Sequence, residues 1–151
     1  MQIVRMLREI ITLAFLSYHS AHHIKRIVKT LDKKFHIIII ENSSDFKLKK
    51  EIENRYKNVQ VKVCSKNLGF SKAMNLAIKM SKTQYVFLNP SDVVITNNLI
   101  YSLLKIVKNF DKFGLLTPSY KDRRIHSNYF VWNKDKKKNL IIKTRKKKIS
   151  S

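Results

Sequence analysis

The 151-residue sequence contains few of the residues that shape turns or cross-link a chain: two glycines, two prolines, one cysteine and one tryptophan. A single cysteine excludes an internal disulfide, so we expect Cys64 to be a buried, reduced thiol and the compartment to be a reducing cytosol. No apolar run approaches the roughly 18 residues of a membrane span. The short run IITLAFL near the N-terminus is interpreted as a buried strand rather than a leader.

Acidic residues are also scarce, with 10 Asp and Glu against 32 Lys and Arg, which gives a formal net charge of +22. Such an excess favours polyanions or anionic lipid as partners. The segment KDKKKNLIIKTRKKK, residues 134–148, carries nine basic residues and one acidic residue and is typical of a solvated tail. A compositional origin is the alternative, because AT-rich coding raises Lys, Ile and Asn without any partner.

Strand-like and helix-like segments alternate regularly along the chain. Strands are predicted at 10–16, 36–40, 59–64, 84–88 and 113–117, and amphipathic helices at 21–31, 46–56, 71–80 and 97–109. This order predicts an α/β fold, a three-layer αβα domain of Rossmann-like type with a mainly parallel sheet of about five strands. We expect this domain to span 1–118, and 119–151 to be a basic, partly disordered extension.

All the strands of a parallel sheet that precede a crossover end at the same edge, and ligands bind beyond those carboxyl ends. The segments at the first four predicted strand ends are SYHS, ENSSD, SKNLGF and NPSD, and every one is polar. We therefore expect them to line one binding site. Three of them have a structural alternative: the acid of ENSSD as a helix cap or solvated turn, the glycine of SKNLGF as a plain turn glycine, and NPSD as a plain turn before a helix.

The stretch KNLGFSKAMN holds one of the two glycines. Gly69 allows a positive φ or the close approach of a ligand to the main chain. Asn67 can bond a sugar or a base edge, and Asn75 lies on the helix that follows. Lys72, in the first helical turn, suits a phosphate near a helix N-terminus. Phe70 is interpreted as core or as a wall of this site.

The NPSD segment supplies hard oxygen ligands. Asn89 and Asp92 are of the kind that Mg²⁺ or Mn²⁺ prefers when it bridges a diphosphate. Because only Asp92 is charged, we expect weak metal affinity without substrate. The neighbouring histidines His19, His22 and His23 lack the spacing and the further ligand of a metal site. No Walker loop, GxGxxG motif or Ser-His-Asp order is present.

In combination these segments resemble the family 2 glycosyltransferases of GT-A fold, particularly the rhamnosyltransferase-like branch. LSYHS, IIIENSSD, KNLGFSKAMN and YVFLNPSD stand in the order of that family's SYN-like loop, VDN-S-D, NxGFxxAxN and LNPD elements, between Ile10 and about Pro118. The resemblance implies a transferase that binds a UDP- or dTDP-linked sugar through Mg²⁺ or Mn²⁺. It implies transfer to a cell-surface polysaccharide or lipid-linked acceptor, in the cytoplasm or at the inner face of the membrane.

The resemblance also implies roles for individual residues. Ser17 and Tyr18 match the loop that approaches the base, and Glu41 matches an acid that contacts uracil or ribose. The implied nucleotide-sugar site comprises Ser17, Tyr18, Glu41, Asn42, Asn67, Gly69, Phe70, Lys72 and Asn75, and the implied metal site Asn89, Ser91 and Asp92. In NPSD the acid comes one residue later than in NPD, so either Ser91 replaces the ligand or the loop is a residue longer.

The acceptor-side half of the family has no counterpart after Pro118. In the family an acid there acts as general base, whereas this chain offers Asp122 and Asp135 in no recognisable setting. No catalytic residue is assigned for that reason. The sequence resembles the donor-binding half of a transferase, either truncated or an inactive remnant.

A non-catalytic basic module is the alternative from a different class. Tyr129, Phe130 and Trp132 lie just before the lysine-rich tail and could stack bases. The same tail would suit a peripheral contact with anionic membrane. Because the lysines spread over every predicted helix and no nucleic-acid motif is present, nucleic acid is the weaker of these two partners.

Overall fold

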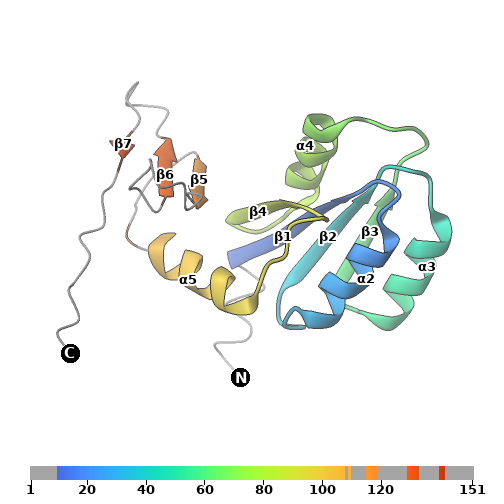
Figure 1. The fold of residues 1–151 in the computed structure, drawn as a ribbon, viewed down its shortest axis with the longest axis horizontal. Helices are drawn as coiled ribbons and strands as arrows, with labels where there is room; N and C mark the ends of the chain where they lie inside the picture. Colours follow the sequence, from blue (N-terminus) through green and yellow to red (C-terminus); the bar gives the residue numbers. More distant parts are fainter. Residues whose placement is uncertain (1–9, 108, 110–114, 119–128, 133–139, 142–151) are drawn as a thin grey trace. The chain divides into compact units, whose positions relative to one another are not determined.

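The computed structural model describes residues 10–107, 109, 115–118, 129–132 and 140–141. The chain divides into two units, residues 1–100 and 101–151, which are described separately. In the first unit strands and helices alternate (Figure 1): β1 (Ile11–Ser17), α2 (Ala21–Thr30), β2 (His36–Glu41), α3 (Phe46–Arg55), β3 (Val59–Val63), α4 (Phe70–Met80) and β4 (Tyr85–Pro90).

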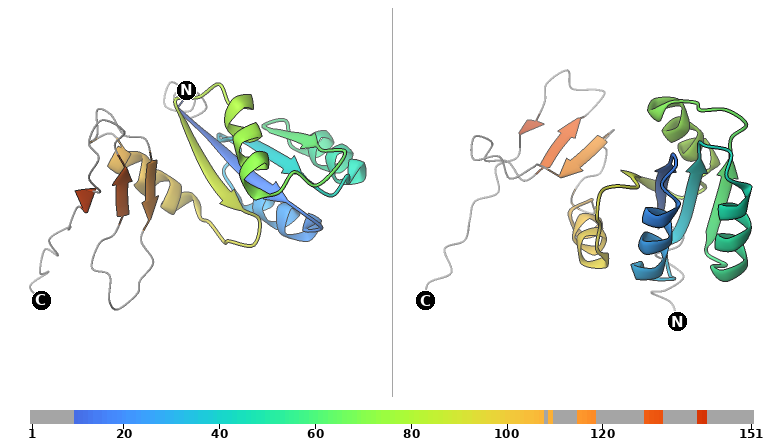
Figure 2. Two further views of the ribbon diagram at one scale, coloured as in Figure 1. Left: turned by 90° about the horizontal axis from the view of Figure 1, so that it is seen from above. Right: turned by 45° about the vertical axis from the view of Figure 1, so that its right-hand side comes forward.

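The four strands of this unit form one parallel sheet in the order β3-β2-β1-β4. Helices α2 and α3 cover one face of the sheet and α4 covers the other, as the views of Figures 1 and 2 show. Right-handed crossovers produce this arrangement, because the chain moves outward from β1 to β3 and then reverses direction to reach β4. The α/β fold with alternating helices and parallel strands is confirmed.

The strand register brings the four carboxyl ends to one level. Ser17 of β1 pairs with Glu41 of β2, and Glu41 in turn pairs with Val63 of β3. On the other side of β1, Leu16 pairs with Pro90 of β4. The loops that follow β1, β2, β3 and β4 therefore leave the sheet at the same edge.

The central strands are continuous apolar runs because helices cover both of their faces. The core on the α4 face is formed by Ala14, Ile38, Ile40, Cys64, Ala73 and Ala77. Cys64 is buried, as expected for a lone cysteine in an apolar strand-like setting. Burial raises the pKa of the Cys64 thiol. The positive charge of Lys62 lowers this pKa, and the negative charge of Glu41 raises it further.

One side chain, Glu53, joins α3 to β3. Its Oε1 accepts a hydrogen bond from the Val61 backbone N–H at 2.7 Å and one from Lys49 Nζ at 3.0 Å. Burial would raise the pKa of Glu53, but the Val61 hydrogen bond and the Lys49 ammonium outweigh it, so this pKa lies below the ordinary value.

We predict that Glu53→Gln lowers the melting temperature at neutral pH and that its difference from wild type shrinks in acid. A carboxyl with a depressed folded-state pKa contributes stability above its unfolded-state pKa, here 4.5, and loses it as the pH falls through the folded-state value. Thermal unfolding between about pH 7 and pH 3 measures this difference. Glu51→Gln is the control, because Glu51 pairs with Lys25 on an exposed surface. A deficit that stays constant over this range would contradict the prediction.

Beyond β4 the chain forms α5 (Asn97–Val107), whose last seven residues belong to the second unit, and then β5 (Leu115–Pro118), β6 (Tyr129–Trp132) and β7 (Leu140–Ile141). These strands form a separate sheet in the order β5-β6-β7, and both pairings are antiparallel. The fifth predicted strand is present as β5, but it belongs to this second sheet, so the parallel sheet has four strands among the described residues. The reason is that YFVW, made of aromatic and β-branched residues, is itself a strand and pairs with β5.

Other parts of the sequence interpretation lie outside the described residues. These are Asp122, Asp135 and the basic tail, except for β7. Within the described part of the chain, no helix is long and apolar enough to cross a membrane.

Candidate functional site

Buried polar residues gather at the carboxyl edge of the parallel sheet. Of the six buried polar or charged residues in the described part of the chain, five lie at or just after a strand end: Ser17, Glu41, Asn42, Asn89 and Ser91. Burying such groups without hydrogen bonds costs about 1–3 kcal/mol each. Their concentration at one edge therefore requires a hydrogen-bond network there, and the contacts below describe it.

Asn42 joins the loops that follow β1, β2 and β3. Its backbone N–H donates to the Ser17 carbonyl at 2.8 Å. Its side-chain Nδ2 donates to Asn67 Oδ1 at 2.6 Å, and its Oδ1 accepts from the Leu68 N–H at 2.9 Å. Asn67 Oδ1 also accepts from the Gly69 N–H at 2.8 Å. Asn42 and Asn67, two of the three asparagines predicted for the nucleotide site, thus shape the approach to Gly69.

Glu41 is 1 % exposed and forms hydrogen bonds within its own loop. Its Oε1 accepts the Ser43 N–H at 2.6 Å and also a hydrogen bond from the Ser43 hydroxyl. Ser43 Oγ in turn accepts from the His19 N–H at 3.2 Å, which ties the β2 loop to the β1 loop. In this structure Glu41 therefore holds the edge together, and its contact with a ribose or a base stays a prediction.

Hydroxyl groups connect the β1 loop to the segment after β4. Ser20 Oγ lies 2.8 Å from Ser91 Oγ and donates to Ser17 Oγ at 3.3 Å. Within the NPSD segment, Asn89 Nδ2 donates to the carbonyls of Pro90 at 2.8 Å and Val93 at 3.0 Å. All four loops are therefore hydrogen-bonded to at least one neighbour, and the predicted convergence of these segments is observed in the structure.

The remaining predicted residues are exposed at the same edge or on α4. Tyr18 is 51 % exposed and Phe70 is 55 % exposed, and the exposed Lys72 and Asn75 follow Phe70 on α4. No side chain caps α4, whose N-cap residue is Gly69. A phosphate at this helix N-terminus would meet backbone N–H groups and the Lys72 ammonium on the same turn.

Backbone with positive φ occurs at this edge. In the described part of the chain, the residues with positive φ are His19 at 50°, Ser44 at 62° and Gly69 at 73°. They lie in the loops after β1, β2 and β3 respectively. For His19 and Ser44 this conformation is strained, and such strain concentrates at functional sites. It adds an observation, independent of burial, that points to the same edge.

The donor set of the NPSD segment fits a metal ion only in part. The Asn89 amide nitrogen is bonded within its own loop, and Ser91, 8 % exposed, is bonded to Ser20. Asp92 is exposed, and among the described residues its carboxylate has no hydrogen bond or ion pair. The same part of the chain holds no cluster of three His, Cys, Asp or Glu suited to a metal. One carboxylate fits an ion whose other ligands are phosphate oxygens.

The sequence matches the protein family described as Glycosyl transferase family 2 over residues 15–150. The chain belongs to glycosyl transferase family 2. No curated protein sequence was found to match it. Because the family match includes all four loops of the carboxyl edge, the buried and exposed polar groups of that edge belong to a family 2 transferase domain.

Among solved structures, this family 2 domain is similar to residues 1–349 of TarS from S. aureus, with a TM-score of 0.57 and 17 % sequence identity. The similarity covers 75 % of this chain and 40 % of that chain. At this identity the likeness shows the fold alone. The present family 2 chain therefore corresponds to less than half of the TarS fragment.

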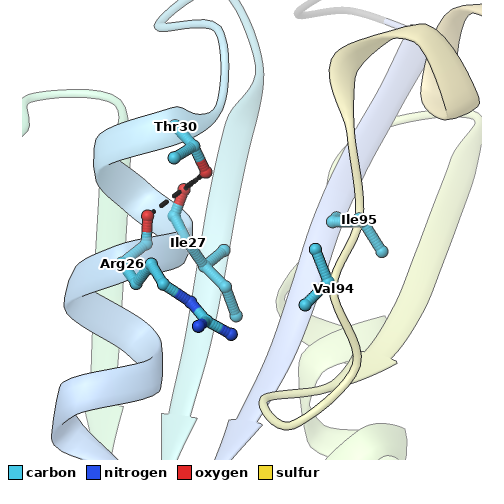
Figure 3. A pocket seen from close by; sticks show the side chains of 5 residues that line it. All are labelled: Arg26, Ile27, Thr30, Val94 and Ile95. Carbon is cyan, nitrogen blue, oxygen red and sulfur yellow. Dashed lines mark hydrogen bonds between the residues drawn. The ribbon is translucent and has the colours of Figure 1, made fainter.

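A cavity of about 240 Å³ lies between α2 and the later part of the loop that follows β4. It is lined by Arg26, Ile27 and Thr30 of α2 and by Val94 and Ile95 of the segment between β4 and α5 (Figure 3). The Thr30 hydroxyl donates to the carbonyls of Arg26 and Ile27 and is thereby satisfied. The lining is mostly aliphatic and Arg26 is its one charged residue. The carboxyl edge gathers more polar groups and remains the candidate site.

The sequence interpretation missed the serines that connect the loops, namely Ser20, Ser43 and Ser44. The hydroxyl of Ser44 donates to the Cys64 carbonyl at 2.9 Å and so ties the β2 loop to the end of β3. The signal was present, because SYHS and ENSSD place serine beside each predicted contact residue. Nothing in the spacing showed which hydroxyl would reach across to another loop.

Proposed function

We propose that the carboxyl edge of the parallel sheet binds a nucleoside-diphosphate sugar, linked to UDP or dTDP, as the donor for glycosyl transfer. The observation that carries this proposal is the hydrogen-bonded edge itself. It buries Ser17, Asn42 and Ser91 as a frame and leaves other side chains exposed for a ligand: Tyr18, Phe70, Lys72 and Asp92. A transferase domain of family 2 needs a donor site, and this edge has the chemistry of one.

In the proposed complex the exposed residues divide the donor between them. Tyr18 contacts the base, and the main chain at Gly69 lies against the nucleotide. Lys72 and the α4 N-terminus meet the diphosphate, whose negative charge they offset. Asp92 would hold Mg²⁺ or Mn²⁺, which when bound neutralises the diphosphate leaving group.

We infer a polysaccharide or lipid-linked acceptor from the resemblance to the rhamnosyltransferase-like branch, with 1–118 as the donor-binding region. The basic extension, 119–151, would hold the protein at anionic lipid on the inner face of the membrane. No described residue is assigned as the general base, so donor binding is the step that we propose for this chain.

Isothermal titration with UDP and with dTDP, each with and without Mn²⁺, tests the proposal. We expect one of the two nucleotides to bind, and to bind more tightly when Mn²⁺ is present. The absence of heat from both nucleotides would contradict it. Steeply salt-dependent binding of RNA or anionic vesicles without any nucleotide binding would favour the basic-module alternative.

A further inference from the structure

Ser20 occupies the N-cap position of α2 but does not cap the helix with its side chain. Serine is favoured at this position because its hydroxyl accepts a hydrogen bond from the second or third helical N–H. Here only the Ser20 backbone carbonyl serves the helix, by accepting from the N–H groups of His23 at 3.0 Å and Ile24 at 3.2 Å. The side chain is therefore available for another use.

The Ser20 hydroxyl connects two loops of the proposed donor site. It accepts from the Tyr18 N–H at 3.1 Å, donates to Ser17 Oγ at 3.3 Å and lies 2.8 Å from Ser91 Oγ, 71 residues further along the chain. One hydroxyl hydrogen and two lone pairs allow three such bonds. Every hydrogen-bonding capacity of the Ser20 side chain is thus used between the β1 loop and the NPSD segment.

The bond to Ser91 determines how the NPSD segment presents its acid. Asn89 closes the segment on itself through the Pro90 and Val93 carbonyls. Ser91, which is buried, points to Ser20, and the next residue, Asp92, is exposed. In NPSD either Ser91 replaces the metal ligand or the loop is one residue longer, so that Asp92 is the ligand. The arrangement favours Asp92, because the Ser91 hydroxyl already has a protein partner and the Asp92 carboxylate has none among the described residues.

We propose that Ser20 is a positioning residue of the donor site, which fixes the loop of Asp92 relative to the loop of Tyr18 through Ser91. This inference rests on the proposed function, since it assigns Asp92 to the metal and Tyr18 to the base. In this proposal Ser20 itself contacts neither the metal nor the base. Its removal should loosen the segment that carries Asp92 and weaken the metal-dependent part of nucleotide binding.

The test compares Ser20→Ala with wild type in two measurements on the full chain. The first uses whichever of UDP and dTDP binds the wild type. It gives the Mn²⁺ ratio, which is the association constant with Mn²⁺ divided by the association constant without it. We expect this ratio to fall roughly 3- to 10-fold, the effect of losing a net hydrogen bond. The second is amide hydrogen exchange without ligand, in which the amides of residues 91–93 should exchange faster. Ser20→Thr, which keeps the hydroxyl, should restore both.

Ser81→Ala is the matched control. Ser81 Oγ is bonded to Thr12 Oγ1 at 3.0 Å and to Thr83 Oγ1 at 2.9 Å, in a hydroxyl cluster at the opposite end of the same sheet. Removing it disturbs a comparable network away from the proposed site. We expect it to leave the Mn²⁺ ratio and the exchange of residues 91–93 unchanged.

A second variant, Ser91→Ala, separates positioning from direct metal binding. If Ser91 acts only through Ser20, Ser91→Ala and Ser20→Ala should reduce the Mn²⁺ ratio equally, and the double variant no further. A much larger loss from Ser91→Ala would make Ser91 a metal ligand and overturn the inference. Unchanged exchange at residues 91–93 in Ser20→Ala would also overturn it, whatever the nucleotide result. A wild-type chain that binds neither nucleotide would overturn both this inference and the proposed function.

Discussion

Asp92→Asn should reduce the Mn²⁺ enhancement of nucleotide binding by roughly 10- to 100-fold, the range seen when groups that support a metal site are removed. Asp92 is the exposed carboxylate of the NPSD segment, and an amide in its place cannot offset the charge of a divalent ion. Because the side chain is exposed and has no partner among the described residues, folding stability should change little. Titration with UDP or dTDP, with and without Mn²⁺, measures the effect.

The control for this variant is Asp45→Asn. Asp45 lies in the loop after β2, where Oδ1 accepts from the Leu48 N–H at 2.8 Å and caps α3. Asparagine caps a helix about as well as aspartate, so this variant removes a carboxylate from the same edge at little cost in stability. Equal losses from both variants would show that Asp92 acts through the general charge of the edge rather than as a ligand.

Gly69→Ala should lower the free energy of unfolding by about 1–3 kcal/mol, since only glycine adopts its backbone conformation readily. Gly69 has φ 73° and ψ 171°. A Cβ placed on it would meet no protein atom within 4 Å, so the expected loss is backbone strain and not a clash. Urea denaturation measures it, with Ser71→Ala, an exposed position two residues later on α4, as the control. A Gly69→Ala protein as stable as wild type would contradict this reading of the loop.

The open space beside Gly69 also bears on function. If a nucleotide lies against this stretch of main chain, the alanine methyl group occupies part of its place. The folded fraction of Gly69→Ala should then bind UDP or dTDP more weakly than wild type, whereas Ser71→Ala should bind equally well. Unchanged affinity of the folded variant would place the nucleotide elsewhere.

The helices and strands of the first unit followed from local patterns. Runs such as FHIIII predict strands buried on both faces, and Ile24, Ile27 and Val28 mark one face of α2, where all three are buried. The second unit did not follow in the same way. YFVW is four residues long and stands among charged and polar residues, and although a strand was predicted at 113–117, no local pattern shows that the two segments pair.

At the candidate site, residue types were predictable and orientations were not. The polar strand ends indicated the edge, and the parallel register brings them together. Whether a side chain supports the loops or faces a ligand depends on contacts between loops. Glu41 and Asn89 were expected to contact ligand or metal. The structure shows Glu41 Oε1 and Asn89 Nδ2 bonded within their own loops, and the contacts with a ligand or metal stay predictions. Ser20 resembles an ordinary cap residue in sequence, and only its distance to Ser91 shows its other role.

The most direct test of the central claim is an NMR titration of the ¹⁵N-labelled full chain with UDP or dTDP and diamagnetic Mg²⁺. Binding at the carboxyl edge predicts that the shifted amides gather in the loops of Tyr18, Asn42, Gly69 and Asp92. Shifts centred on Arg26 and Thr30 of α2, or no shifts with either nucleotide, would contradict it.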